Sequence, residues 1–282
     1  ARPGDVVLCE ALTYPGLRAI AGQLGLRLVG VPLDDDGIDP DALAKLCAEH
    51  HPKVLYCNPV LLNPAAVTLS DERRHRVVQI ARRHNLPIIE DDAYGLLPSH
   101  RPPALAALAP ELTYYLCGFS KSLGAGLRIA YLALPSARLR SRLAVTLRAT
   151  TVMASPITAA LASCWVQDGT ADLALTLTRR ESQARQELVA EILAGADYRS
   201  HPEAFHVWLR MPPAWSRVAF AARLRAQGIN VVVSDAFAVN GKPPEAVRLC
   251  LGGPASRQDL GHALHVIADA LQQPGAASAG FF

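Results

Sequence analysis

The chain has 282 residues, of which 50% are hydrophobic and 19% are charged, and its formal net charge is +3. This composition excludes a disordered chain, because enough apolar surface is available to offset the entropy lost on folding. The charge is too small to indicate a nucleic-acid-binding face by itself, and no apolar run approaches the ~20 residues that cross a membrane as a helix.

Short apolar segments alternate with helical patterns through the first half of the chain. Strands are expected at residues 5–9, 27–32, 53–57, 86–90, 113–117 and 129–133. Helices are expected at residues 14–24, from residue 40 onward, and at 70–84. Asp39 is the predicted N-cap of the second helix, with Pro40 at its first position. Strands that alternate with helices in this way predict a mostly parallel sheet covered by helices on both faces.

The second half of the chain has a different pattern, with long helices first and strands later. Helices are expected at residues 136–167, with a break at Ser155-Pro156, and at residues 170–194. Strands are expected at residues 204–209, 230–233 and 246–250, with helices at 218–227 and 256–271. This half predicts a smaller α+β domain, in keeping with the roughly two domains expected for this length.

Several residue types that support other functions occur without the pattern that those functions need. The six cysteines are scattered without a CxxC pair, so a reduced, cytoplasmic protein with most of its thiols buried is expected. Neither an HExxH metal motif nor a GxSxG nucleophile motif occurs, so metal and serine-hydrolase chemistry are not expected. Four arginines of the 136–167 segment could bind phosphates, but a solvated helix face is favoured because no aromatic or glycine-rich pattern accompanies them. They are Arg138, Arg140, Arg142 and Arg148.

Charged residues follow two of the expected strands at the point where each strand ends. Three acids, Glu90, Asp91 and Asp92, come at the carboxyl edge of the sheet, where open α/β folds bind ligands. A cluster that caps a helix is the alternative. Lys121 follows another strand and is succeeded by small residues and Arg128, which suits a nucleophilic amine beside an anion site. A surface lysine in a turn is the alternative there.

A proline-rich loop after the 53–57 strand adds a third polar group. Its Asn63 could donate a hydrogen bond to a ligand oxygen, although asparagine before proline is also common in ordinary turns.

The order of these residues resembles the fold-type-I pyridoxal-phosphate enzymes, the aspartate aminotransferase superfamily. The resemblance covers residues 4–271 and implies a three-layer α/β/α large domain at residues 1–150. Linker helices and a smaller C-terminal α+β domain would follow at residues 151–273, with a loose tail at 274–282. The motifs that carry the resemblance are, in chain order, Gly4-Asp5, Tyr14-Pro15-Gly16, Asn63-Pro64, Asp91-x-Ala93-Tyr94, Phe119-Ser120-Lys121, Gly126-Leu127-Arg128 and Arg248.

The resemblance implies three catalytic residues. Lys121 would form the aldimine with the cofactor, pyridoxal 5′-phosphate (PLP), and carry the proton during amino transfer. Asp91 would pair with the ring nitrogen of the cofactor and keep it protonated. Tyr94, together with Asn63, would donate hydrogen bonds to the phenolate oxygen of the ring.

The resemblance also implies residues that bind the cofactor and the substrate without taking part in the chemistry. Tyr14 would stack on the cofactor ring, Arg128 would bind its phosphate, and Arg248 would bind the α-carboxylate of the substrate. Glu90 and Asp92 are expected to cap or pair rather than to catalyse.

Three positions depart from the pattern of the superfamily. Gly118 stands where a serine or threonine usually contacts the phosphate, Ala125 stands where proline is common, and Leu62 stands where glutamine is frequent. The glycine-rich phosphate loop of the superfamily lies further upstream of Tyr14 than this sequence extends. We therefore expect a large domain truncated at its N-terminus that binds PLP more weakly than an intact protein. A degenerate fold that no longer binds PLP is a further alternative.

Within the superfamily, segments at residues 153–156, 165–171, 206–209 and 248–252 resemble the aminotransferase-like domain of MocR-type regulators of the GntR family. Those proteins join this domain to a winged-helix DNA-binding domain. Two functions therefore stay open: an aminotransferase acting on an amino acid and a 2-oxo acid, or a domain that senses PLP or an amino compound with little or no turnover. The resemblance implies a homodimer for the intact protein, DNA contact only through a domain outside this chain, and no membrane association.

Overall fold

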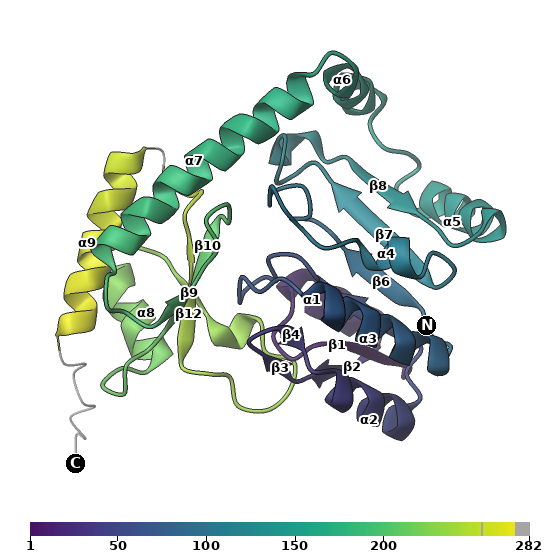
Figure 1. Cartoon of the computed structure of the whole chain (residues 1–282), viewed down its shortest axis with the longest axis horizontal. Helices are drawn as coiled ribbons and strands as arrows, with labels where there is room; N and C mark the ends of the chain where they lie inside the picture. The colour runs from purple at the N-terminus through teal and green to yellow at the C-terminus, as the bar shows by residue number, and fades with distance from the viewer. Residues whose placement is uncertain (255, 274–282) are drawn as a thin grey trace.

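A six-stranded sheet is formed by the first half of the chain (Figure 1). The computed structural model describes residues 1–254 and 256–273, so the predicted tail at 274–282 lies outside the described residues. Every neighbouring pair of strands is parallel except the last, which is antiparallel. The mostly parallel sheet predicted from the sequence is confirmed. In spatial order the strands are β2 (Arg27–Val31), β1 (Val6–Glu10), β5 (Val54–Cys57), β6 (Ile88–Asp91), β7 (Thr113–Gly118) and β8 (Ala130–Ala133).

The helices between these strands begin within one residue of the positions that the sequence predicts, and Asp39 is the predicted N-cap. The Asp39 carboxylate accepts hydrogen bonds from the backbone at the start of α2 (Pro40–His50), and the Ser70 hydroxyl does so for α3 (Asp71–Arg83). Both helices pack onto the strands in the main hydrophobic cluster, which includes Leu43, Val77 and Leu8. The first helix, α1 (Pro15–Gln23), begins directly after Tyr14.

Four short elements were not expected from the sequence. They are β3 (Leu33–Asp34) and β4 (Gly37–Ile38), which pair as a hairpin, α4 (Leu105–Leu108) and β9 (Tyr198–Arg199). Elements of two to four residues are too short to show a hydrophobic period, so only their tertiary partners reveal them. The other strand and helix ends differ from the expected ones by at most two residues, except that α5 ends at Thr150, before the predicted break at Ser155-Pro156.

Three helices connect the two halves of the chain (Figure 1). They are α5 (Ala137–Thr150), α6 (Pro156–Gln167) and α7 (Thr170–Ile192). No residue of α5 is buried within the chain, and its four arginines are exposed, which agrees with the expected solvated helix face. The division of the chain near residue 150 stays a prediction.

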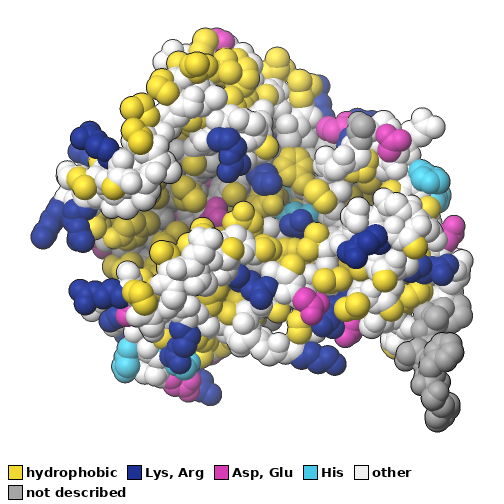
Figure 2. Space-filling view, turned by 180° about the vertical axis from the view of Figure 1, so that it is seen from behind, with side chains coloured by type: hydrophobic (Ala, Val, Ile, Leu, Met, Phe, Trp, Pro, Cys, Tyr) yellow, Lys and Arg dark blue, Asp and Glu magenta, His cyan; other side chains and the backbone are white. Residues whose placement is uncertain are grey.

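This connecting region exposes large apolar side chains. Figure 2 shows hydrophobic groups over the end of the molecule that these elements form. Ile157 is 80% exposed, and the same surface includes side chains of β8 and the start of α7. These side chains are Tyr131, Leu132, Val145, Leu147, Met153, Ile157, Leu161, Leu173 and Leu177.

A second sheet, which is antiparallel throughout, is formed near the C-terminus. Its order is β11 (Val232–Val233), β12 (Ala246–Cys250), β10 (His206–Arg210) and β9. The helices α8 (Arg217–Ala226) and α9 (Arg257–Gln272) pack with it and with the end of α7 in a separate hydrophobic cluster. Among the described residues, no helix has the length and hydrophobicity to cross a membrane.

Candidate active site

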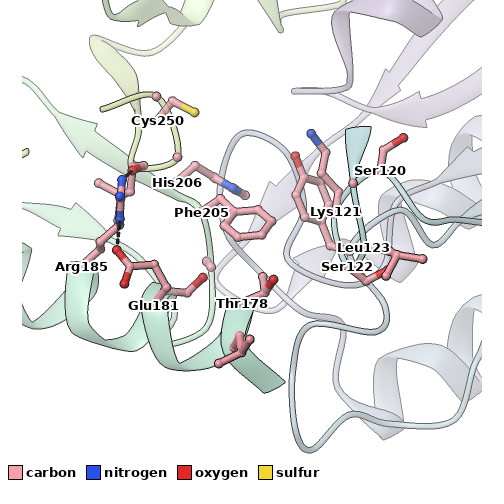
Figure 3. Close-up of a pocket in the computed structure, with 18 of the residues that line it drawn as sticks. Ser120, Lys121, Ser122, Leu123, Thr178, Glu181, Arg185, Phe205, His206 and Cys250 are labelled. Carbon is pink, nitrogen blue, oxygen red and sulfur yellow. Dashed lines mark hydrogen bonds and ion pairs between the residues drawn. The ribbon is translucent and has the colours of Figure 1, made fainter. Parts of the chain in front are cut away.

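A cavity of about 670 Å³ lies between the two sheets (Figure 3). We call Tyr94 and residues 120–124 its N-terminal wall and residues 204–206 and 248–253 its C-terminal wall. The middle of α7, at residues 177–185, lines a third side. The lining side chains that matter most are Tyr94, Lys121, Ser122, Glu181, Phe205, His206 and Arg248.

Lys121 lies on the N-terminal wall, in the turn that follows β7. The amides of Leu123 and Gly124 both donate to the Phe119 carbonyl oxygen, at 2.9 and 3.0 Å, which closes this turn. The Lys121 Nζ lies 5.6 Å from the centre of the Tyr94 ring. A primary amine is therefore held against the buried face of a tyrosine, at the carboxyl edge of the sheet.

Tyr94 joins the two walls, because its ring also lies 5.5 Å from that of His206 on β10. The tyrosine is only 7% exposed, and burial raises the pKa of its hydroxyl to about 12, although nearby Arg248 opposes the shift. Burial likewise lowers the pKa of His206 to about 4. Both rings are thus uncharged at neutral pH.

Asp91 ends β6 and lies behind the N-terminal wall. Its Oδ2 accepts a hydrogen bond of 2.5 Å from the Tyr56 hydroxyl, and its Oδ1 accepts one of 3.3 Å from the amide of Ala93. Burial raises the pKa of this carboxyl, while the Tyr56 hydrogen bond opposes the shift. Asp91 does not itself line the cavity in the described structure.

The two acids on either side of Asp91 have other partners. Glu90 accepts hydrogen bonds from the backbone amides of residues 105 and 106 at the start of α4, and its Oε1 lies 3.7 Å from Arg74. The Asp92 carboxylate accepts from the Arg101 guanidinium at 2.5 Å and from the Tyr115 hydroxyl at 2.6 Å. The expectation that Glu90 and Asp92 cap and pair is confirmed.

Arg248 contacts the loop that follows β5. Its Nη1 donates to the Asn63 Oδ1 at 2.6 Å, and its Cζ lies 5.2 Å from the centre of the Phe237 ring. The register of β10 and β12 pairs His206 with Cys250 and Trp208 with Arg248. Since paired residues share a face of a sheet and side chains alternate along a strand, Arg248 faces the same side as His206.

Unsatisfied polar atoms at the cavity indicate a place for ligand groups. Within residues 1–254 and 256–273, the Arg248 Nε and the Ser122 Oγ are buried without a hydrogen-bond partner. Such atoms are costly unless a partner reaches them. In the same part of the chain, neither Lys121 nor Arg248 forms an ion pair with a carboxylate. The site therefore offers two cations to an anionic ligand.

The third side of the cavity carries a carboxylate that is already paired. Hydrogen bonds from Arg257 and Arg185 lower the pKa of Glu181, on α7, to about 2. Figure 3 shows the Glu181–Arg185 contact at the end of the cavity away from Lys121. This acid does not offset the charge of Lys121 and Arg248.

Four of the site residues predicted from the sequence do not line the cavity: Asp91, Asn63, Tyr14 and Arg128. Tyr14 is 47% exposed at the start of α1. Arg128 is also exposed and has a left-handed backbone conformation, with φ of 54°. The structure thus brings Lys121, Tyr94 and Arg248 together at the cavity. Asn63 contacts this group through its hydrogen bond with Arg248, and Asp91 lies behind it.

Four polar residues at the site were missed by the sequence analysis. They are Glu10, Tyr56, Asn58 and His206, and all are buried. Glu10 carried the same signal as Glu90, an acid at the end of a buried strand, and could have been found in that way. Nothing local marks the other three, because their roles depend on neighbours in the sheets.

The donor set fits a ligand that has an electrophilic carbon, a basic nitrogen and an anionic group. An amine, a buried carboxylate and unpaired guanidinium and hydroxyl groups are the protein groups that bind these three. Among the described residues, no cluster of three or more His, Cys, Asp or Glu side chains could hold a metal ion.

This chain is similar to known proteins both in sequence and in fold. Residues 1–267 match the family model for aminotransferase class I and II. The chain is 30% identical over 267 residues to YdeF, an uncharacterized HTH-type transcriptional regulator of Bacillus subtilis, covering 94% of this chain and 58% of that protein. The chain thus spans little more than half the length of this curated relative.

Two solved structures share the fold over almost the whole chain. An archaeal alanine:glyoxylate aminotransferase is 27% identical with a TM-score of 0.87, covering 96% of this chain and 70% of that one. LysN, an alpha-aminoadipate aminotransferase of Thermus thermophilus complexed with N-(5′-phosphopyridoxyl)-L-leucine, is 25% identical with a TM-score of 0.86. There the match covers 96% of this chain and 72% of LysN.

Proposed function

Because the chain belongs to the aminotransferase class I and II family, we propose that it binds PLP at Lys121 and acts on the amino group of an amino acid. Family membership confirms the resemblance to the fold-type-I superfamily seen in the sequence. The similarity to an HTH-type regulator agrees with the second resemblance, to MocR-type proteins. The observation that carries the proposal is that the unpaired amine of Lys121 and the unpaired guanidinium Nε of Arg248 meet at one cavity beside Tyr94.

Each residue of the site has a proposed task. PLP, when bound, supplies an electron sink for the charge that develops at the α-carbon of an amino acid. Lys121 holds the cofactor and moves a proton at its Nζ. Asp91, kept in place by Tyr56, stabilises a protonated ring nitrogen. Tyr94 and Asn63 orient the ring through its hydroxyl oxygen.

The remaining tasks concern anionic groups. Arg248 binds the α-carboxylate of the amino acid, because its Nε is free and no carboxylate of the described chain pairs with it. Arg128 binds the phosphate and Tyr14 covers the ring, which requires both exposed side chains to turn toward the cavity. The phosphopyridoxyl ligand of LysN supports a phosphate-bearing cofactor in this fold.

The exposed apolar surface supports a homodimer for the intact protein. The side chains of β8, α5, α6 and the start of α7 form a patch of a kind that marks protein interfaces. A second copy of the chain is the partner we propose.

A sensor that serves a DNA-binding domain is the second candidate function. The observation in its favour is that the match to YdeF covers 94% of this chain but only 58% of that regulator. In such a protein the same residues would bind PLP and an amino compound, and occupancy of the site, rather than turnover, would be the output. DNA contact would then belong to a region outside this chain.

The first experiment asks where PLP is held. The chain has only four lysines, Lys45, Lys53, Lys121 and Lys242, so borohydride reduction followed by peptide mapping identifies the attachment residue directly. We expect a phosphopyridoxyl group on Lys121. Attachment at another lysine, or none, would overturn the proposal.

The second experiment separates the two candidate functions. The loaded protein is mixed with amino acids, and conversion of PLP to pyridoxamine phosphate is followed by absorbance with and without a 2-oxo acid. Sustained production of a new amino acid identifies an aminotransferase. Conversion without sustained turnover identifies a sensor.

A further inference from the structure

We propose that Glu10 and Asn58 are positioning residues of this site, and that the buried Glu10 carboxyl acts on Asp91 from behind the N-terminal wall. Glu10 holds the backbone of Asn58, and the Asn58 side chain fixes Asp91 and Asn63 relative to each other. The assignment deepens the proposed function and, for its effect on PLP, rests on it.

Glu10 is the last residue of β1 and is only 1% exposed. Its Oε1 accepts a hydrogen bond of 2.5 Å from the backbone amide of Asn58, and its Oε2 accepts one of 3.2 Å from the Thr13 hydroxyl. Because β1 and β5 are adjacent parallel strands, the residue that ends β1 lies beside the residue that follows β5. This contact could not be read from residues that are 48 positions apart in sequence.

The side chain of Asn58 forms hydrogen bonds with two residues of the site. Its Nδ2 donates to the Asp91 carbonyl oxygen at 2.7 Å, and its Oδ1 accepts from the Asn63 amide at 3.1 Å. Asn63 in turn accepts from Arg248. A continuous series of hydrogen bonds therefore runs from Glu10 to Arg248, across both sheets.

The surroundings of Glu10 make its charge sensitive to pH. The backbone donor at Asn58 stabilises the carboxylate, but burial outweighs it and raises the pKa of Glu10 to about 7. The Thr13 hydroxyl also lowers the pKa of Glu10, and the charge of Asp91 raises it. The positive charge of Arg18 lowers the pKa of the neighbouring Cys9 thiol. The titratable groups that face this region are Cys9 on β1, Arg18 on α1, Tyr56 and Cys57 on β5, and Asp91 on β6.

Ionised Glu10 adds a second negative charge near Asp91. A negative charge there favours a protonated basic nitrogen and opposes ionisation of the neighbouring carboxyl. The protonation of a ring nitrogen beside Asp91 therefore depends on Glu10, even though Glu10 touches no ligand. A glutamate that only held the backbone, without a change of charge, would leave the protonation of that nitrogen unaffected.

The test on the loaded protein is a pH titration of the PLP absorbance bands. Glu10→Gln keeps an oxygen that can accept from Asn58 but cannot ionise, so we expect the transition near neutral pH to disappear. Thr13→Val removes a donor to the carboxylate and should move the transition to higher pH. Glu90→Gln is the matched control, since Glu90 is a buried acid on a neighbouring strand that contacts α4 instead, and it should leave the transition unchanged.

A second measurement needs no cofactor. Asn58→Ala should raise hydrogen exchange at residues 58–63 and 91–94 of the unloaded protein, and should weaken PLP binding roughly 10-fold in the loaded one. Unchanged exchange overturns the positioning role. An identical absorbance titration for Glu10→Gln and the wild type overturns the charge role. Failure of the wild type to attach PLP at Lys121 overturns the proposed function instead, while the exchange result still decides whether Glu10 and Asn58 position the site.

Discussion

The ionisable side chains on the two sides of the cavity have different kinds of partner. Behind the N-terminal wall, Glu10, Glu90 and Asp91 are acids that accept hydrogen bonds from backbone amides. On the C-terminal wall, His206 and Arg248 lie against aromatic rings. Burial raises the pKa of the three acids and lowers that of the histidine. Burial therefore favours the neutral form on both sides.

The difference follows from the two kinds of sheet. Parallel strands end at one edge, so the N-terminal wall is assembled from residues that follow different strands, where free amides are available to carboxylates. The C-terminal wall is one face of an antiparallel pair, where side chains stand beside side chains. Lys121 on the N-terminal wall and Arg248 on the C-terminal wall are the cations that an anionic substrate would meet between them.

The largest expected effect comes from removing the amine of the N-terminal wall. Lys121→Ala should abolish the reduced phosphopyridoxyl adduct, and any amino transfer should fall on the order of 10³-fold or more, because both the attachment and the proton carrier are lost. Borohydride trapping and absorbance measure the two effects. Lys45→Ala is the control, since Lys45 is an exposed residue of α2 paired with Glu49. A residual adduct in Lys121→Ala would argue for a different attachment site.

Substitutions of two neighbouring acids behind the N-terminal wall should affect different quantities, one the reaction rate and the other the stability. Asp91→Asn should lower the rate of the amino-acid half-reaction on the order of 10²-fold, because the ring nitrogen loses its anionic partner. Glu90→Gln should leave that rate within a few-fold and lower the free energy of unfolding by about 1–3 kcal/mol, because the start of α4 and Arg74 lose a charged acceptor. Single-turnover absorbance and denaturant unfolding give the two quantities. Equal effects of both changes would contradict the assignment of separate roles.

The pH dependence of stability tests the acid behind the N-terminal wall. The pKa of Glu10 is about 7 in the folded protein, against 4.5 for an unperturbed glutamate. Its contribution is therefore full below pH 4.5 and is lost as the pH rises through 7, a change of about 3 kcal/mol in the free energy of unfolding. Relative to the wild type, Glu10→Gln should gain about that much stability between pH 5 and pH 8. If the free energies of unfolding of Glu10→Gln and the wild type differed by the same amount at pH 5 and at pH 8, the raised pKa of Glu10 would be contradicted.

The histidine of the C-terminal wall should show the opposite sign. Its pKa falls from 6.5 to about 4 on folding, so its contribution is full above pH 6.5 and is lost as the pH falls through 4, again by about 3 kcal/mol. The free energy of unfolding of His206→Asn should therefore approach that of the wild type as the pH is lowered. In the wild type the two profiles largely cancel between pH 4.5 and 6.5, so only the single variants resolve them. Unfolding of His206→Asn and wild type at pH 4, 5.5 and 7 measures the difference.

The smallest effect is expected from a change that keeps the charge of the C-terminal wall. Arg248→Lys should weaken amino-acid binding about 10-fold, because lysine provides a point charge in place of a planar fork of donors. The concentration of amino acid that gives half-maximal conversion of PLP measures this. Arg210→Lys is the control, since Arg210 is an exposed residue of β10 paired with Asp197. An unchanged half-saturation for Arg248→Lys would remove Arg248 from the carboxylate site.

The sequence predicted most elements of the fold because their signals are local. The apolar segment that became β5 and the Asp39 cap of α2 needed no partner to be recognised. The hairpin of β3 and β4 and the four residues of α4 were missed, because α4 depends on Glu90 and the hairpin on strand pairing.

The candidate site divides in the same way. Lys121, Asp91 and Tyr94 follow strands and could be identified by order and spacing. The Arg248–Asn63 contact joins residues 185 positions apart, and the anchoring of Asn58 by Glu10 depends on β1 lying next to β5. No sequence pattern reports which strands are neighbours.

The amino-acid order by itself determined the family, the kinds of element and the amine, acid and phenol at the strand ends, because hydrophobic period and motif spacing are properties of neighbouring residues. Only the tertiary structure decided which polar groups are buried together and therefore which are charged. Desolvation depends on every surrounding atom, and sheet order brings those atoms from distant parts of the chain.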